Sequence, residues 1–132
     1  MKDGKAVTLQ NTREQFNKYF LDRGQTPPQT FKETSPLKRR WDHSQLDIVY
    51  IDGGHDYKSV ALDIEYWLSF LKPDGIICGD DFTLEFTGVM RAVLDSAEKH
   101  GFKVRRYLRM WLLETNLNRN KLKSWEELNY KT

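Results

Sequence analysis

Only one cysteine, Cys78, occurs among the 132 residues of this chain. An intrachain disulfide and a cysteine-based zinc site are therefore excluded, because each needs more than one thiol. No apolar run approaches the ~18 residues of a membrane-spanning helix, and the charged N-terminus is not followed by the apolar segment of a signal peptide. These absences predict a cytoplasmic protein without a membrane partner, in which Cys78 is a small buried apolar side chain.

Positive and negative charges nearly balance each other, with 21 basic and 19 acidic residues and a net charge of +2. Binding of nucleic acid through released counterions needs basic residues clustered on one face. The densest basic run is residues 38–40, and Arg105, Arg106 and Arg109 follow later; we interpret both groups as solvated surface charge. Nucleic acid is therefore not expected as a partner, while a hydrophobic content of 39% is typical of one globular domain with one core.

Two apolar segments that end in acidic residues are the main feature that is present. Residues 46–52 finish at Asp52, and residues 75–82 contain Asp80 and Asp81, so each segment is expected to be a strand. A strand, a helix and a strand in this order form a right-handed crossover of a parallel sheet. We therefore expect an α/β fold with a mainly parallel sheet and helices on both faces. The apolar stripe of the intervening helix is Val60, Ile64, Trp67, Leu68 and Leu71.

The remaining segments are predicted from capping and turn patterns. Residues 12–15 read as a capping box that opens a helix ending at Gly24, and a further helix runs from Gly88 to just before Gly101. The other expected elements are short strands at 6–9 and 30–34, a helical turn at 35–41, a C-terminal antiparallel hairpin of strands 102–106 and 109–114, and a short helix at 124–128.

Parallel strands end at the same edge of a sheet, which is where open α/β sheets bind their ligands. Asp52, Asp80, Asp81 and His55 are therefore expected to converge at that edge. Gathered carboxylates repel one another, so such a cluster usually needs a cation or a catalytic role. Mg²⁺ prefers oxygen ligands and keeps some waters, which would leave positions open for a substrate hydroxyl and make that hydroxyl easier to deprotonate.

Each of these residues also has a purely structural interpretation. A strand-end aspartate can cap the turn that follows, which explains Asp52 better than the adjacent pair Asp80 and Asp81. His55 could act as a general base, because its pKa lies near neutrality, or could fix its loop by hydrogen bonding, and both interpretations stay open. A Mg²⁺-dependent hydrolase or phosphoryl-transfer protein is disfavoured, because it needs a phosphate cradle and the sequence has no P-loop motif.

Residues 47–57, with the sequence DIVYIDGGHDY, resemble a signature of class I S-adenosylmethionine-dependent methyltransferases, in the branch that contains small-molecule and sugar O-methyltransferases. Three further features follow in the family's order. Residues 71–75 are similar to its LKPGG turn, residues 80–82 are similar to its DDY or DDF, and residues 88–89 open a helix. The resemblance covers about residues 30–114, and the ordered set is more specific than any single motif.

The resemblance implies a Rossmann-like class I methyltransferase fold and a transferase that methylates an oxygen of a small molecule or sugar, with S-adenosylmethionine as donor and Mg²⁺ as a second cofactor. Because the matching strand ends bind Mg²⁺ in metal-dependent members, Asp52, Asp80 and Asp81 would be the metal ligands. His55 would be the catalytic residue beside the methyl donor and the acceptor. The implied cofactor-binding residues are Ser35, which would approach the adenine, with Asp52, Gly53, Gly54 and His55.

The chain departs from this family in its first part, where glycine is scarce. Class I methyltransferases hold the methionine end of the cofactor on a glycine-rich loop, because glycine permits close approach of the backbone. Here only Gly4 precedes Gly24. We therefore expect residues 1–115 to form the C-terminal two-thirds of an incomplete methyltransferase domain, followed by a polar tail, 116–132. A truncated or split coding sequence, a protomer completed by a partner, and a degenerate relative are three explanations that stay open.

An incomplete sheet would leave one of its inner strands as an edge, and an open edge invites pairing with another chain. We therefore expect a homo-oligomer or a missing N-terminal partner. The alternative to an active enzyme is a non-catalytic remnant, or an interaction module of the same fold.

Overall fold

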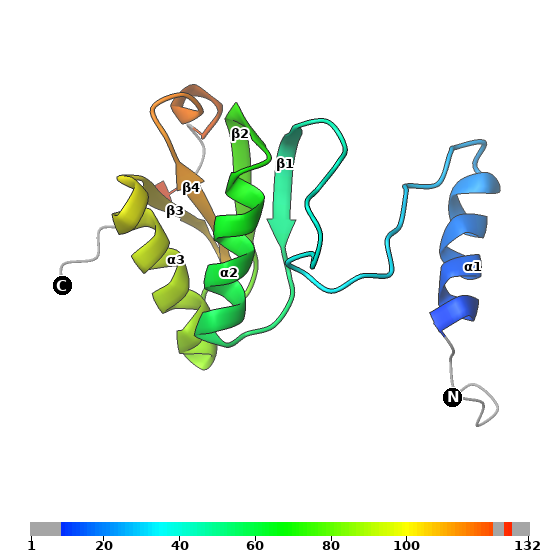
Figure 1. The fold of residues 1–132 in the computed structure, drawn as a ribbon, viewed down its shortest axis with the longest axis horizontal. Helices are drawn as coiled ribbons and strands as arrows, with labels where there is room; N and C mark the ends of the chain where they lie inside the picture. Colours follow the sequence, from blue (N-terminus) through cyan, green and yellow to red (C-terminus); the bar gives the residue numbers. More distant parts are fainter. Residues whose placement is uncertain (1–8, 123–125, 128–132) are drawn as a thin grey trace. The chain divides into compact units, whose positions relative to one another are not determined.

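A computed structural model describes residues 9–122 and 126–127, and Figure 1 labels its helices and strands. The chain divides into two compact units, residues 1–33 and residues 34–132. The first unit contributes one helix, α1 (Leu9–Leu21). No helix within the described ranges is both long and apolar enough to cross a membrane.

Helix α1 ends shortly before Gly24, as the sequence predicts. Gly24 has a φ of 68°, and the Gln25 N–H donates to the Phe20 carbonyl at 2.9 Å, so a left-handed residue closes the last turn. The predicted capping box is wrong, because α1 already begins at Leu9 and Thr12 lies inside it.

Residues 25–45 contain neither a helix nor a strand. The strand predicted at 30–34 and the helical turn predicted at 35–41 are therefore wrong. Proline lacks the backbone N–H that regular structure uses, and three prolines lie at 27, 28 and 36. The strand predicted at 6–9 is also wrong at its last residue, which belongs to α1, and residues 6–8 lie outside the described residues.

The second unit contains the strand–helix–strand arrangement that the sequence predicts, with β1 and β2 parallel. The predicted boundary between the helix and the second strand is wrong, because α2 ends at Leu68, and Leu71 and the predicted turn at 72–75 belong to β2. Its elements in chain order are β1 (Leu46–Ile51), α2 (Tyr57–Leu68), β2 (Leu71–Gly79), the 3-10 helix η1 (Leu84–Phe86), α3 (Thr87–His100), β3 (Lys103–Tyr107), β4 (Met110–Glu114), the 3-10 helix η2 (Arg119–Leu122) and β5 (Glu126–Glu127). The helix predicted at 124–128 falls largely outside the described residues, and its described part is strand β5.

The sheet has the strand order β1-β2-β4-β3-β5 and is mixed. Only β1 and β2 run parallel, while the pairs β2–β4, β4–β3 and β3–β5 are antiparallel. The prediction of a mainly parallel sheet is therefore wrong. The antiparallel direction of β3 and β4 follows from their short connection, because only Leu108 and Arg109 separate the paired residues Tyr107 and Met110. A parallel pair would need a crossover of a dozen or more residues.

Helices α2 and α3 pack against each other and on the same face of the sheet (Figure 1). The core between them and the sheet includes Val49, Ile51, Val60, Ile64, Ile77, Val89, Val93 and Trp111. On the opposite face, Leu122 of η2 packs on Leu112 and on the buried thiol of Cys78, as the sequence predicts for this cysteine. The prediction of helices on both faces holds in part for the described residues of this unit, because both α-helices lie on one face and the 3-10 helix η2 covers only part of the other, where Ile48 and Tyr50 of β1 remain 62% and 49% exposed.

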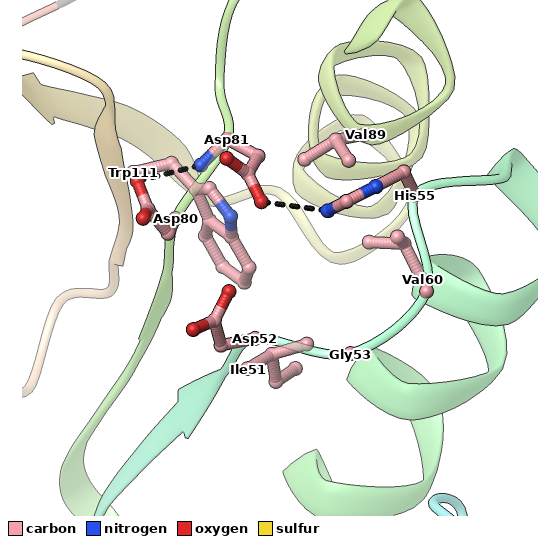
Figure 2. A pocket seen from close by; sticks show the side chains of 10 residues that line it. Ile51, Asp52, Gly53, His55, Val60, Asp80, Asp81, Val89 and Trp111 are labelled. Atoms are coloured by element: carbon pink, nitrogen blue, oxygen red, sulfur yellow. Dashed lines mark hydrogen bonds and ion pairs between the residues drawn. The ribbon is translucent and has the colours of Figure 1, made fainter. Parts of the chain in front are cut away.

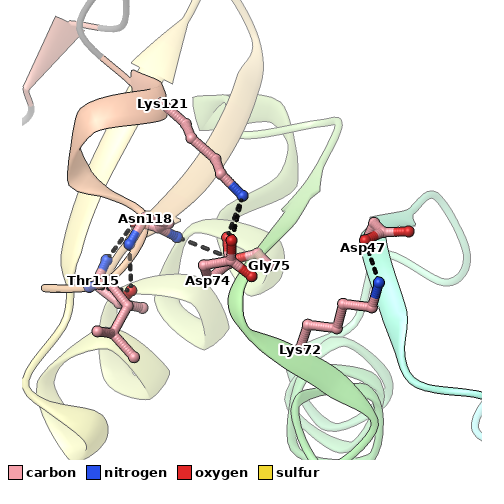
Figure 3. A network of polar contacts seen from close by, with 8 residues as sticks. Asp47, Lys72, Asp74, Gly75, Thr115, Asn118 and Lys121 are labelled. Carbon is pink, nitrogen blue, oxygen red and sulfur yellow. Dashed lines mark hydrogen bonds and ion pairs between the residues drawn. The ribbon is translucent and has the colours of Figure 1, made fainter.

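Residues after β4 fold back onto the start of β2. The side-chain amide of Asn118 is buried and donates to the carbonyls of Gly75 and Leu113, each at 3.1 Å. Lys121 forms an ion pair of 2.9 Å with Asp74 and lowers the pKa of that carboxyl (Figure 3). This polar network holds the end of β2 that is remote from Asp80.

Gly79 permits the closest approach in the sheet, directly before the acidic residues. A Cβ atom at this position would lie 2.5 Å from the Ile51 carbonyl oxygen and 2.6 Å from the ring of Trp111. Neither neighbour can move easily, because Ile51 is paired in β1 and Trp111 is fully buried. Glycine is therefore needed here for the packing of β1, β2 and β4 around the carboxyl end of the parallel pair.

Gly79→Ala is expected to lower the free energy of unfolding by about 3 kcal/mol, because overpacking a rigid core is costly. The matched control is Gly53→Ala, whose Cβ would meet only the Asp63 carboxylate, at an ordinary contact distance of 3.6 Å. That control is expected to cost less than about 0.5 kcal/mol. Urea denaturation of both variants measures the difference, and equal costs would show that Gly79 is not the constrained position.

Candidate functional site

The three predicted acidic residues converge at the carboxyl end of the parallel strand pair. Ile51 and Gly79 are paired in the β1–β2 register, so Asp52 and Asp80 leave the sheet side by side. The Asp80 N–H continues the ladder by donating to the Ile51 carbonyl at 3.3 Å. Carboxylate oxygens of Asp52, Asp80 and Asp81 all lie within 4.8 Å of one another, and Figure 2 shows them around one pocket.

Asp81 owes its position to a left-handed backbone turn. Its φ is 66°, a conformation that aspartate tolerates better than most residues because of its short polar side chain. The Asp81 N–H donates to the Asp80 carboxylate at 2.8 Å. The next residue, Phe82, is buried in the core and its N–H donates to the Arg109 carbonyl at 2.9 Å. The turn thus buries Phe82 and leaves Asp81 at the pocket.

His55 lies beside this carboxylate. Its Nε2 atom is 2.9 Å from Asp81 Oδ2, and its ring stacks on Phe86 with the centroids 4.0 Å apart. Gly88 makes room for the histidine loop, because a Cβ there would lie 2.8 Å from the His55 carbonyl oxygen. Tyr57 anchors the other end of the loop through a 2.8 Å hydrogen bond to Asp95 in α3. The histidine is therefore oriented by a carboxylate and an aromatic ring, while its side chain remains 47% exposed.

Arg109 is the residue of this site that sequence reasoning missed. Its Nε donates to Asp80 Oδ1 at 3.0 Å and its Nη2 forms a second, shorter ion pair with Asp81 Oδ1. The two carboxylates raise the pKa of the Arg109 guanidinium above its usual value. Interpreting Arg109 as solvated surface charge is therefore wrong. The signal that could have found it is topological, because the start of β4 lies next to the end of β2 only when β4 inserts antiparallel.

One pocket contains almost all of the predicted site residues. Its polar lining is Asp52, Gly53, Gly54, His55, Asp80 and Asp81, and its apolar lining is Ile51, Val60, Val89 and Trp111 (Figure 2). The arrangement combines hard oxygen donors, an imidazole and an exposed glycine turn at a sheet edge. Chemically, it can hold a cation and accept a proton from a group that enters between them.

Ser35 does not line this pocket. Its hydroxyl donates to Asp63 Oδ1 of α2 at 2.5 Å and accepts from Trp67 Nε1 at 3.0 Å. Asp63 is buried, and burial raises the pKa of its carboxyl while the Ser35 hydrogen bond opposes that rise. Because Asp63 Oδ2 faces Gly53, Ser35 is connected to the pocket loop through this buried carboxylate.

Ser35→Ala is expected to cost about 1 kcal/mol of stability, because it leaves the buried Asp63 carboxylate and the Trp67 indole without their partner. It should also raise the pKa of Asp63 further. Ser69→Ala is the control, since Ser69 is exposed and its hydroxyl bonds only to the Glu65 carbonyl of the same helix, at 3.3 Å. Urea denaturation and carboxyl NMR titration measure both effects. A Ser35 variant as stable as the control would contradict the structural role of this contact.

The structure defines the class of protein as an α/β domain with acidic residues at the carboxyl end of a parallel strand pair. Comparison with known families agrees with this class. A family model described as "Methyltransferase domain" matches residues 3–82, and the chain belongs to this family. The match includes His55 and all three acidic residues, but it ends before Arg109. A search of curated proteins found no match to the chain.

Proposed function

We propose that the chain is a domain of an S-adenosylmethionine-dependent methyltransferase that uses Mg²⁺ to methylate a hydroxyl oxygen of a small molecule or sugar. Membership of the methyltransferase family supports the reaction class and implies this donor. The observation that carries the rest is the convergence of Asp52, Asp80 and Asp81 within 4.8 Å. Three carboxylates at one sheet edge match the donor chemistry of a hard divalent cation.

The residues present fit a magnesium ion. Mg²⁺ binds through a small number of carboxylates and keeps several coordination positions for water or substrate. Asp52, Asp80 and Asp81 would hold it. When bound there, the ion would supply a lowered pKa to a coordinated acceptor hydroxyl.

Methyl transfer is a direct displacement, so the protein mainly has to position the partners and take up one proton. Because His55 Nε2 donates to the Asp81 carboxylate, the other ring nitrogen, Nδ1, would accept the proton of the acceptor hydroxyl. The acceptor oxygen then forms a bond to the methyl carbon as the carbon–sulfur bond breaks, and the sulfonium becomes a neutral thioether. In this proposal Asp81 holds the imidazole in place and stabilises its protonated form through their 2.9 Å contact.

The proposed cofactor contacts surround the loop after β1. Asp52, Gly53, Gly54 and His55 would contact the methyl donor, since the two glycines allow its close approach to the backbone. Ser35 would mark the adenine side, where Asp63 connects it to Gly53.

A second candidate is a non-catalytic member of the same family that retains the sheet and has lost turnover. The observation that favours it is Arg109, which already forms ion pairs with two of the three carboxylates. A cluster of carboxylates that is paired with a cation of its own chain depends less on a metal ion for stability.

Calorimetric titration with S-adenosylhomocysteine, with and without Mg²⁺, tests the proposal. We expect binding in the micromolar range, because the loop residues and the pocket are present in the folded chain. A folded sample that does not bind under either condition would contradict the enzyme proposal and favour the non-catalytic candidate.

The matched variant for this experiment is His55→Gln. It is expected to weaken S-adenosylhomocysteine binding only modestly, because the side chain remains polar, and to lose any turnover that acceptor screening reveals, because an amide cannot take up the proton. Unchanged turnover would leave His55 with a purely structural role.

We also propose that two copies associate along β1. Among the described strands β1 lies at the edge of the sheet, and its open face carries the exposed side chains Ile48 and Tyr50. Exposed apolar side chains on an edge strand favour pairing with another strand. Light scattering at high concentration should show a dimer that the double variant Ile48→Thr, Tyr50→Thr dissociates and that Leu84→Thr, at an 84% exposed residue elsewhere, preserves. A clean wild-type monomer would refute this.

A further inference from the structure

We propose that Arg109 is a resident cation of the acidic site, which competes with Mg²⁺ for the same carboxylates and must leave before the metal can bind. This inference rests on the proposed metal-dependent function and concerns a residue outside the part of the chain that the family model matches. It makes the turn between β3 and β4 the element that sets the metal affinity of the site.

The guanidinium of Arg109 bridges the two carboxylates that come from β2. Nε contacts Asp80 Oδ1 at 3.0 Å, and Nη2 contacts Asp81 Oδ1. Arginine presents its donors in a rigid planar fork, so it can bind two carboxylates at once, which the point charge of a lysine cannot do in the same way. By contrast, the Asp52 carboxylate forms no hydrogen bond or ion pair within the described residues.

Metal and arginine cannot use these oxygens at the same time. Asp80 Oδ1 already accepts from the Asp81 N–H at 2.8 Å in addition to Arg109, so a metal would have to bind Asp80 through Oδ2, next to the guanidinium. Asp81 Oδ2 is likewise in contact with His55 Nε2. A divalent ion next to the guanidinium would also meet a like charge at short distance, which is strongly unfavourable near a protein surface. Mg²⁺ binding therefore requires that the Arg109 side chain moves away.

The position of Arg109 allows such a movement without disturbing the core. Its side chain is 54% exposed and belongs to a two-residue turn, in which the neighbouring Leu108 is 75% exposed. The backbone of the turn is held independently, because the Phe82 N–H donates to the Arg109 carbonyl at 2.9 Å. Because the guanidinium is half exposed, its release into water costs less than the breaking of a buried ion pair. Only the guanidinium has to enter the solvent, and a doubly charged cation can displace it while a singly charged ion of the same size gains less from the three carboxylates.

The experiment is a calorimetric titration of the full chain with Mg²⁺ alone, comparing the wild type with Arg109→Gln. Removal of the competing charge is expected to tighten Mg²⁺ binding about tenfold. In metal-free buffer the same variant should melt at a lower temperature than the wild type, because three clustered carboxylates then lack their cation, and Mg²⁺ should restore the melting temperature.

Arg119→Gln is the matched control. It removes the same charge at η2, near the start of β2, where the neighbouring Asn118 and Lys121 contact Gly75 and Asp74. Its Mg²⁺ affinity is expected to equal that of the wild type. If the control binds Mg²⁺ as tightly as Arg109→Gln does, net charge alone accounts for the effect and the proposal fails.

The other outcomes separate this inference from the proposed function. Measurable and equal affinities of the wild type and Arg109→Gln, or weaker binding by the variant, overturn the competition and leave the metal site intact. If neither protein binds Mg²⁺, both the competition and the metal-assisted chemistry are overturned. Binding of S-adenosylhomocysteine is a separate measurement, which tests the methyl-donor site.

A second measurement does not depend on how the variant folds. In wild-type protein labelled with nitrogen-15, Mg²⁺ should move the Arg109 Nε–H resonance to the position of a solvated arginine. Saturation with Mg²⁺ that leaves this resonance unchanged would refute the proposed displacement.

Discussion

The pairing of Ile51 with Gly79 in the parallel strands β1 and β2 is the constraint on which the rest of the site depends. It brings Asp52 and Asp80 out of the sheet next to each other, and it requires a glycine because a side chain at residue 79 would collide with the Ile51 carbonyl and the Trp111 ring. Trp111 in turn fixes β4 against β2. The geometry of the carboxylates is therefore a consequence of how tightly three strands approach one another.

Charge balance is the second physical requirement of this site. Three carboxylates within 4.8 Å repel each other, and the chain itself supplies Arg109 and His55 as partners for two of them. Both partners come from loops outside β2, so folding brings a guanidinium and an imidazole to the carboxylates and leaves Asp52 without an ion pair among the described residues. A metal ion would replace part of this internal compensation, which connects the proposed chemistry to the position of one arginine.

Much of the site could be predicted from local sequence. Residues 46–52 and 75–82 are apolar and end in acid, and Val60, Ile64 and Trp67 have helical spacing, so periodicity predicted the strand–helix–strand unit and the topology of parallel sheets predicted that its acidic ends converge. An antiparallel hairpin was predicted, but the position of β4 beside β2 and the predominance of antiparallel pairs were not, because they depend on pairing between distant segments. Ser35 was expected at the cofactor, whereas its hydroxyl bonds to Asp63 and Trp67, which lie far along the chain.

The sequence by itself determined the strand–helix–strand unit, the family and the acidic residues, because these depend on patterns among residues that are close together in the chain. Only the tertiary structure decided that both helices of the second unit cover one face, that His55 is held by Asp81 and that Arg109 bridges Asp80 and Asp81. Those features depend on contacts between residues 26 or more positions apart, and no periodicity records which distant strands will pair.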